Sequence, residues 1–303
     1  MNKKTIVFIQ EGQSLLSKVL KASFDKTEIR ILPSNYTPFD REKLAKEINN
    51  NYQQVIFYGY EYQFYVLLPL ISKKVVKKFI IDKSLPLLVK PYFLSSLSQI
   101  FEYKERGLID YIATTQYDLY ITFKEKMKFI QFDYKGQNMA KKSNSIGILN
   151  YYYLEESDFY NELSGIALSK IPSARVLDQN IITKKFGEDF NVEIIEEKDI
   201  EKLIYENTAN LNCMFCDINN ILSLMSMDAG IPCILGNTNL LDDNKKLKEY
   251  LVLKSDDDVN EISEKINHSI DKKEEILKLY KEWRLEYSKK AKKSIDDFLK
   301  LGG

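Results

Sequence analysis

The sequence predicts an α/β protein of two Rossmann-like domains followed by a long C-terminal helix. Short apolar runs alternate with amphipathic helical patterns along most of the 303 residues, which is typical of a parallel sheet covered by helices. A polar stretch around residue 138 separates two such series, and domains commonly contain about 100–150 residues. From residue 273 onward, large apolar residues recur every three or four positions, as they do on one face of a helix.

The composition argues against several classes of protein. Basic and acidic residues balance at 44 each, so the sequence shows no nucleic-acid footprint. No apolar stretch approaches the roughly 18 residues that a membrane span needs, and the first apolar run is too short for a signal peptide. Three cysteines do not make a disulfide framework, which favours a cytoplasmic location. Peripheral membrane association and a homo-oligomer remain open.

The first domain is predicted to cover residues 1–138. Strands are expected at 5–9, 28–32, 53–59, 77–82, 108–115 and 127–132. Gly12 follows the first strand, where it permits either a plain tight turn or the close approach of a ligand. Asp82 ends the fourth strand, at the carboxyl edge where functional carboxylates of parallel sheets lie. We expect Asp82 to act as a general base or to position an acceptor hydroxyl; a plain turn cap is the alternative.

The second domain is predicted to cover residues 139–303. Strands are expected at 145–153, 173–178, 190–196, 211–215, 232–235 and 251–255. The final helix, 273–299, has an apolar face that includes Tyr280 and Tyr287. This domain therefore repeats the alternating pattern of the first.

Residues 211–239 are the most informative stretch, because they predict a strand, a short helix and a second strand. Asp217, Asn219 and Asn220 form a polar break, and each can cap the helix that Ile221 opens. Gly230 supplies a left-handed helix ending. A helix N-terminus at the carboxyl end of a parallel strand attracts phosphate. We therefore expect an anionic group to bind near residues 219–221.

The same stretch resembles the donor-binding segment of the retaining GT-B glycosyltransferases, whose motif is E-x7-E followed by a small-residue G-x-P-V-[IV]. AGIPCIL, residues 229–235, is similar to the end of that motif, and Asp217 falls on its first Glu. The resemblance implies a GT-B fold with the donor between the two domains. It further implies transfer of a sugar from a nucleotide diphosphate, with a UDP-sugar favoured, to a glycan or protein hydroxyl, without a metal. Cell-surface glycan biosynthesis is the implied setting.

Particular residues follow from this resemblance. Asp217 would face the sugar, with an ordinary helix cap as the alternative. Asn237 and Thr238, after the last small strand, would contribute to the donor site together with Asn219, Asn220 and Ile221.

Two positions depart from the family pattern. Met225 stands where the second Glu holds the ribose, and a thioether cannot replace that hydrogen bond. Asn150 and either Glu155 or Glu156 stand where the family has an Arg and a Lys that clamp the diphosphate, and Arg175 is a candidate replacement. Two alternatives therefore stay open, a catalytically inactive GT-B-like partner or accessory subunit of a glycosyltransferase, and a sugar-nucleotide epimerase of the same fold.

Overall fold

The computed structural model of the chain describes residues 4–10, 14–25, 27–59, 61–82, 91–135, 144–149, 173–177, 193–196, 200–212, 221–236, 240–254 and 258–302. The chain divides into two compact units. Unit 1 contains Met1–Asp133 and Tyr287–Gly303, and unit 2 contains Tyr134–Glu286. The chain therefore passes between the units twice, and the second passage lies within the last helix, α13 (Lys273–Lys300). The predicted boundary after residue 138 lies outside the described residues.

Unit 1 is built on a parallel sheet with the strand order β2-β1-β3-β4-β5-β6. Its strands are β1 (Thr5–Gln10), β2 (Glu28–Leu32), β3 (Gln54–Tyr58), β4 (Val76–Ile81), β5 (Tyr111–Thr114) and β6 (Lys128–Phe129). The helices are α1 (Ser14–Ser23), α2 (Pro38–Asn51), α3 (Tyr62–Leu67), the 3-10 turn η1 (Leu68–Leu70), α5 (Pro91–Glu105) and α6 (Tyr117–Thr122). Every residue of β3 is buried, as expected for a central parallel strand covered on both faces.

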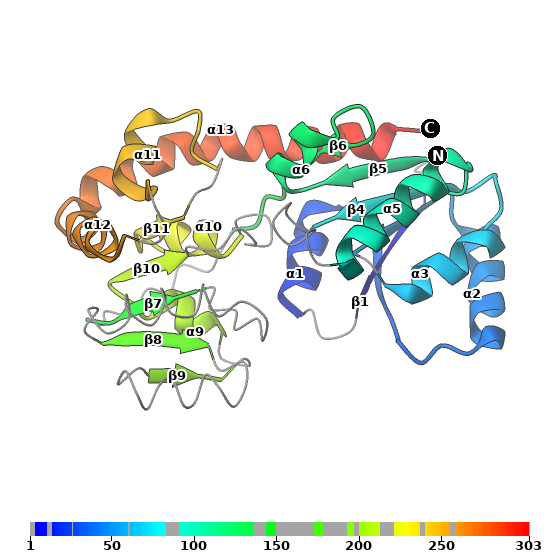
Figure 1. Cartoon of the computed structure of the whole chain (residues 1–303), viewed down its shortest axis with the longest axis horizontal. Helices are drawn as coiled ribbons and strands as arrows, with labels where there is room; N and C mark the ends of the chain where they lie inside the picture. The colour runs from blue at the N-terminus through cyan, green and yellow to red at the C-terminus, as the bar shows by residue number, and fades with distance from the viewer. Residues whose placement is uncertain are drawn as a thin grey trace. The chain divides into compact units, whose positions relative to one another are not determined.

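One core of unit 1 lies between its sheet and three helices. Leu44 and Ile48 of α2, Phe64 of α3 and Leu97 of α5 belong to the same buried cluster as Phe57 of β3. In Figure 1 these three helices lie together beside the strands of this sheet. The alternation of strand and helix predicted from the sequence therefore folds into a layered α/β unit.

Unit 2 contains a second parallel sheet with the strand order β11-β10-β7-β8-β9. Its strands are β7 (Ile146–Ile148), β8 (Ala174–Leu177), β9 (Glu193–Ile195), β10 (Ala209–Asn212) and β11 (Cys233–Leu235). Its helices are α9 (Ile200–Tyr205), α10 (Ile221–Asp228), α11 (Lys245–Leu251) and α12 (Val259–Asp271). Two parallel sheets with flanking helices, followed by a long C-terminal helix, confirm the predicted fold class.

The predicted strand at 251–255 is shorter than expected. Leu251 ends α11, and Val252 forms only an isolated parallel bridge with Leu235 of β11. A single bridge extends the sheet by one pair and adds no further strand to the described residues.

The end of α13 is held within unit 1 by a buried lysine. Lys78 of β4 is 0% exposed, and its Nζ donates to the carbonyls of Phe298 at 2.7 Å and Leu299 at 3.1 Å. Gln54 of β3 accepts from the same ammonium at 2.8 Å and donates to Leu299 O at 3.1 Å. The last carbonyls of a helix lack partners within the helix and carry its negative end. The cation therefore caps the helix and stabilises it against the sheet.

Candidate functional site

The strand order of unit 2 reverses between β7 and β10. β8 and β9 extend the sheet on one side of β7, whereas β10 and β11 extend it on the other. Ligands of open parallel sheets bind at such a reversal, outside the carboxyl ends of the strands. β7 ends at Ile148 and β10 ends at Asn212. The carboxyl ends of these two strands therefore define the candidate donor site.

Most of the predicted donor residues lie just beyond these strand ends in the sequence. Asn150 follows β7, the predicted group 217–220 follows β10, and Asn237 and Thr238 follow β11. Asn150, Asp217, Asn219, Asn220, Asn237 and Thr238 all lie outside the described residues, as does Gly12 of unit 1. Their assignment to the site therefore stays a prediction.

Ile221 is the first residue of α10, and its side chain is 1% exposed. The side chain therefore belongs to the core, and only the backbone of this residue could face a ligand. All residues from Ile221 to Met227 are buried, so α10 is enclosed along its length. A helix enclosed in this way presents chiefly its two ends.

A polar seam joins α10 to β10. Asn212 Nδ2 donates to Ser223 Oγ at 2.6 Å, and Asn210 Nδ2 donates to Ser226 Oγ at 2.8 Å. The two asparagines are two residues apart on a strand and the two serines are three apart on a helix, so each pair shares one face of its element. These directional bonds fix α10 along β10 and stabilise its first turn beside the carboxyl end of that strand.

Met225 lies in the middle of α10 and is 0% exposed. The family resemblance puts the ribose-binding Glu at this position. A buried thioether offers no acceptor for ribose hydroxyls. Any nucleotide bound by this chain must therefore use other contacts for the ribose.

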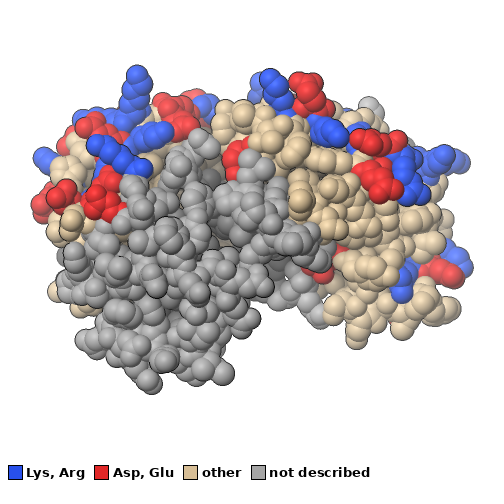
Figure 2. Space-filling view, viewed as in Figure 1, with Lys and Arg blue, Asp and Glu red and all other residues tan. Residues whose placement is uncertain are grey.

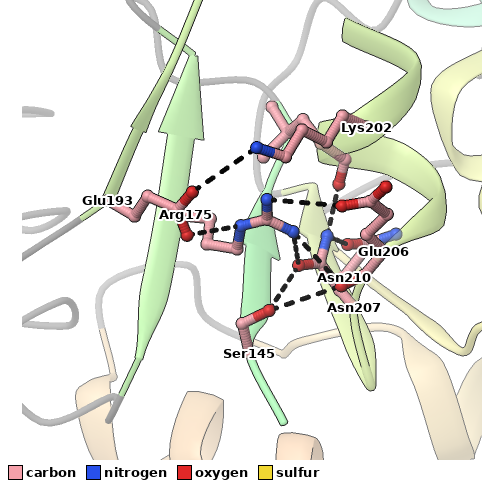
Figure 3. Close-up of polar contacts among 8 residues, drawn as sticks. Ser145, Arg175, Glu193, Lys202, Glu206, Asn207 and Asn210 are labelled. Atoms are coloured by element: carbon pink, nitrogen blue, oxygen red, sulfur yellow. Dashed lines mark hydrogen bonds and ion pairs between the residues drawn. The ribbon is translucent and has the colours of Figure 1, made fainter. Parts of the chain in front are cut away.

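Arg175 lies near the amino ends of the strands, opposite the carboxyl ends that define the candidate donor site. It belongs to a polar cluster that Figure 3 shows. It is the second residue of β8 and pairs across the sheet with Glu193, the first residue of β9. Its Nε donates to Glu193 Oε2 at 3.0 Å, and its Nη1 donates to Asn207 Oδ1 at 3.3 Å. The side chain is 5% exposed. Arg175 is thus engaged at the amino ends of the strands, and the hypothesis that it clamps a donor phosphate is wrong.

The cluster at the amino ends of the strands also includes the side-chain amides of Asn207 and Asn210, which lie against β7. Ser145 Oγ donates to Asn207 Oδ1 at 2.9 Å, and Asn207 Nδ2 donates to Asn210 Oδ1 at 2.8 Å. Gly147 of β7 lies directly beside them, because a Cβ at this position would be 2.2 Å from both Asn207 Nδ2 and Asn210 Oδ1. The cluster is a buried network that specifies the packing of β7 against β10.

In unit 1, the ends of β4 and β5 carry neighbouring polar groups. Asp82 follows β4 and is 9% exposed. Gln116, which follows β5, donates from its side chain to Asp82 O at 3.0 Å and from its backbone to Thr114 Oγ1 at 3.1 Å. The buried hydroxyl of Thr115 has no hydrogen-bond partner in the described part of the chain. The Asp82 carboxylate and the Thr115 hydroxyl are therefore the polar groups at this edge that could bind a substrate hydroxyl, whereas Thr114 is fully buried and holds Gln116. Thr114 and Thr115 end the strand expected at 108–115 and Gln116 follows it, so polar residues at a strand end are the sequence signal for this second group.

Charge and metal-ligand patterns add little to this picture. On the face shown in Figure 2, Lys and Arg alternate with Asp and Glu over the described surface. Among the described residues, no three His, Cys, Asp or Glu side chains are arranged to hold a metal ion. None of the described helices is both long and apolar enough to cross a membrane.

No protein-family model matches the sequence, and no curated protein matches it. Solved structures do match. Anabaena HepE in complex with UDP and glucose matches with a TM-score of 0.64 at 11% identity over 98% of both chains. WaaG, a glycosyltransferase involved in lipopolysaccharide biosynthesis, matches with a TM-score of 0.62 at 11% identity over 99% of this chain and 100% of that one. A glycosyltransferase from Rickettsia africae matches with a TM-score of 0.59 at 9% identity, over 98% and 94%.

The chain has the GT-B fold. In this chain the fold consists of two parallel-sheet units and a C-terminal helix whose last residues belong to the first unit, and the similarity to HepE and WaaG covers 98% and 99% of the chain. At 11% identity this similarity establishes the fold, whereas the chemistry depends on the residues at the ends of the strands.

Proposed function

We propose that this GT-B chain is a glycosyltransferase that moves a sugar from a nucleotide-diphosphate donor, with a UDP-sugar favoured, to a hydroxyl of a glycan or a protein. The carrying observation is the reversal of strand order between β7 and β10 in unit 2, because predicted donor residues follow both strands in the sequence. The similarity to HepE, which was solved with UDP and glucose, supports the same class of donor.

In the proposed reaction, the bond between the anomeric carbon and the diphosphate oxygen breaks, and a bond from the acceptor oxygen to that carbon forms. The leaving diphosphate gains negative charge. Asn219, Asn220 and the backbone of Ile221 would stabilise it at the positive end of α10, which substitutes for a metal ion. Asp217 would face the sugar, and Asp82 would accept the proton of the acceptor hydroxyl.

We further propose that this transfer serves cell-surface glycan synthesis in the cytoplasm. WaaG is involved in lipopolysaccharide biosynthesis and matches this chain over 99% of its length. A panel of glycan and peptide acceptors, assayed with the preferred UDP-sugar, identifies the acceptor.

A catalytically inactive accessory role is the second candidate. It is favoured by the burial of Met225, which removes the ribose contact of the family motif, and by the engagement of Arg175 with Glu193 at the far edge of the sheet. Both observations reduce the contacts available to a donor without changing the fold.

Titration calorimetry with UDP, GDP and UDP-sugars separates the two candidates. Binding of one nucleotide below millimolar concentration, together with release of free sugar from its UDP-sugar, supports the transferase. Arg175→Lys is the matched control, because it changes a cation at the amino edge and should leave UDP affinity unchanged. If no nucleotide binds, the transferase proposal fails and the accessory role stands.

A further inference from the structure

The C-terminal end of α10 is bonded to α13 by a carboxylate that is largely, but not fully, enclosed. Asp228 is the last residue of α10, and Arg284 of α13 contacts it at two points, Nε to Oδ1 at 3.1 Å and Nη2 to Oδ2 at 3.2 Å. The Arg284 side chain is 7% exposed and the Asp228 side chain is 14% exposed. Tyr280 also donates its hydroxyl to Asp228 Oδ1 at 2.7 Å. Burial raises the pKa of the Tyr280 phenol well above its usual range, so this donor stays protonated.

Arg284 has a second partner, at the point where the chain enters unit 2. Its Nη2 donates to the carbonyl of Tyr134 at 3.1 Å, and Tyr134 is the first residue of unit 2. The guanidinium of Arg284 therefore links the C-terminal end of α10 to Tyr134, where the chain first passes from unit 1 into unit 2. A lysine ammonium lacks the planar fork needed to hold a carboxylate at two points and a carbonyl together.

On the unit 1 side, the same two chain segments are held together by other residues of α13. Tyr287 donates its hydroxyl to Phe132 O at 3.0 Å, and the backbone N–H of Gln131 donates to Ser294 Oγ at 2.9 Å. Tyr287 is the first residue of α13 that belongs to unit 1. The segments in which the chain passes between the units, around residues 131–134 and 284–294, are therefore hydrogen-bonded to each other within unit 1 and within unit 2. Arg284 also bonds α10 to these segments.

We propose that Arg284 is a positioning residue that couples α10 to the segments where the chain crosses between the units. The N-terminus of α10 follows the predicted donor loop, and its C-terminus carries Asp228. α10 is one hydrogen-bonded helix of eight residues, so a single rigid element joins the donor loop to Asp228, and in this proposal it carries the coupling. Occupation of the donor site therefore changes the stability of the crossing segments 131–134 and 284–294. The ligand-dependent part of this inference rests on the proposed function.

The first test needs no ligand. Hydrogen exchange is measured at increasing denaturant in the full chain, in the double variant Asp228→Leu with Arg284→Met, and in Arg284→Lys. Replacing both partners of a buried ion pair by apolar groups often preserves stability, so the double variant should fold. We expect residues 224–228 and 284–288 to open together in the native chain and separately in both variants. Joint opening in the double variant, or separate opening in the native chain, would overturn the coupling.

A control breaks a more exposed arginine–carboxylate pair in unit 1. Arg30 of unit 1 donates to Glu47 at 2.8 Å, whereas α10 belongs to unit 2. Arg30→Met should leave the joint opening of residues 224–228 and 284–288 intact. Loss of joint opening in this control would show a general effect of destabilisation and would overturn the specific role of Arg284.

The second test adds UDP and a UDP-sugar. In the native chain UDP should slow exchange at residues 131–134; in the double variant it should still bind within about threefold but leave that exchange unchanged. The kcat for UDP-sugar turnover, counted per mole of folded, UDP-binding protein so that loss of folded protein is corrected for, should fall about tenfold with KM nearly constant. Equal slowing in both proteins refutes the coupling to the site. Failure of UDP to bind the native chain refutes the proposed function instead, and the ligand-free exchange still decides the coupling.

Discussion

Gly147→Ala is the substitution with the sharpest structural expectation. Gly147 lies in β7 under the amides of Asn207 and Asn210. An added Cβ would be 2.2 Å from each amide and 2.9 Å from Leu203 O. No side chain fits at this position unless both amides move.

The cost follows from the contacts that would be lost. Overpacking a filled interior costs about 1–3 kcal/mol. Asn210 also donates to Ile204 O and Ser226 Oγ, each at 2.8 Å, and displacing it leaves buried polar groups that cost about 1–3 kcal/mol each. We therefore expect Gly147→Ala to lower the free energy of unfolding of unit 2 by about 2–6 kcal/mol.

The assay is urea unfolding followed by hydrogen exchange of peptides from β7 and β10, so that unit 2 is observed separately. Gly107→Ala is the control. Gly107 has a φ of +70° but open space around a Cβ, so the same substitution should cost only about 1–2 kcal/mol of backbone strain in unit 1. If Gly147→Ala unfolds within about 0.5 kcal/mol of the native chain, the packing described here is refuted.

Three further outcomes are expected. Lys78→Met removes the buried donor to the carbonyl of Phe298, so unit 1 should lose about 1–3 kcal/mol and the end of α13 should exchange faster; unchanged exchange there would contradict the capping role. Burial and the hydrogen bond to Glu28 raise the pKa of Tyr52 from 10.0 to about 12. Because the folded state holds this proton more tightly, stability should fall as the pH rises from about 10 to 12, and Tyr52→Phe should abolish that slope in urea titrations; parallel slopes would refute it. Asp82→Asn should lower UDP-sugar turnover about a hundredfold with UDP affinity nearly constant, and full turnover would remove Asp82 from the mechanism.

Strands with apolar runs bounded by polar residues could be predicted from the sequence. β1, β2 and β4 lie within about one residue of their expected ranges. The described side chains of β1 are buried and those of β4 nearly all are, whereas β2 is an edge strand that is recognised by its apolar residues although it is partly exposed. The helix α6 was not predicted, because Tyr117–Thr122 is rich in residues that favour strands and its N-cap Gln116 makes no side-chain capping bond. The strand expected at 127–132 is also shorter than predicted, because β6 contains only Lys128–Phe129.

Buried polar residues account for the other differences. β10 was expected to begin at Leu211 but begins at Ala209, because Asn210 and Asn212 are buried with serine partners on α10. From the sequence, Arg175 could be a free cation for a phosphate. In the structure it bonds Asn207, which is 32 residues away in the sequence and so could not be recognised as its partner. Such long-range pairs cannot be recognised from local pattern, whereas helix caps and apolar periodicity can.

The candidate site divides in the same way. The order of elements predicted that Asp82 and residues 217–221 follow strands, and so belong to carboxyl edges. The reversal between β7 and β10 required knowledge of which strands pair. Sequence alone therefore indicated which loops matter, and strand pairing showed that β7 and β10 are neighbours in the sheet.

Photo-crosslinking with 5-azido-UDP, followed by mass spectrometry of the labelled peptides, tests the proposed donor site most directly. We expect labelling of the peptide that spans residues 213–239, suppressed by excess UDP. Labelling confined to the amino edge around Arg175, or labelling that UDP does not suppress, would contradict the proposal that the nucleotide binds at the carboxyl ends of β7 and β10.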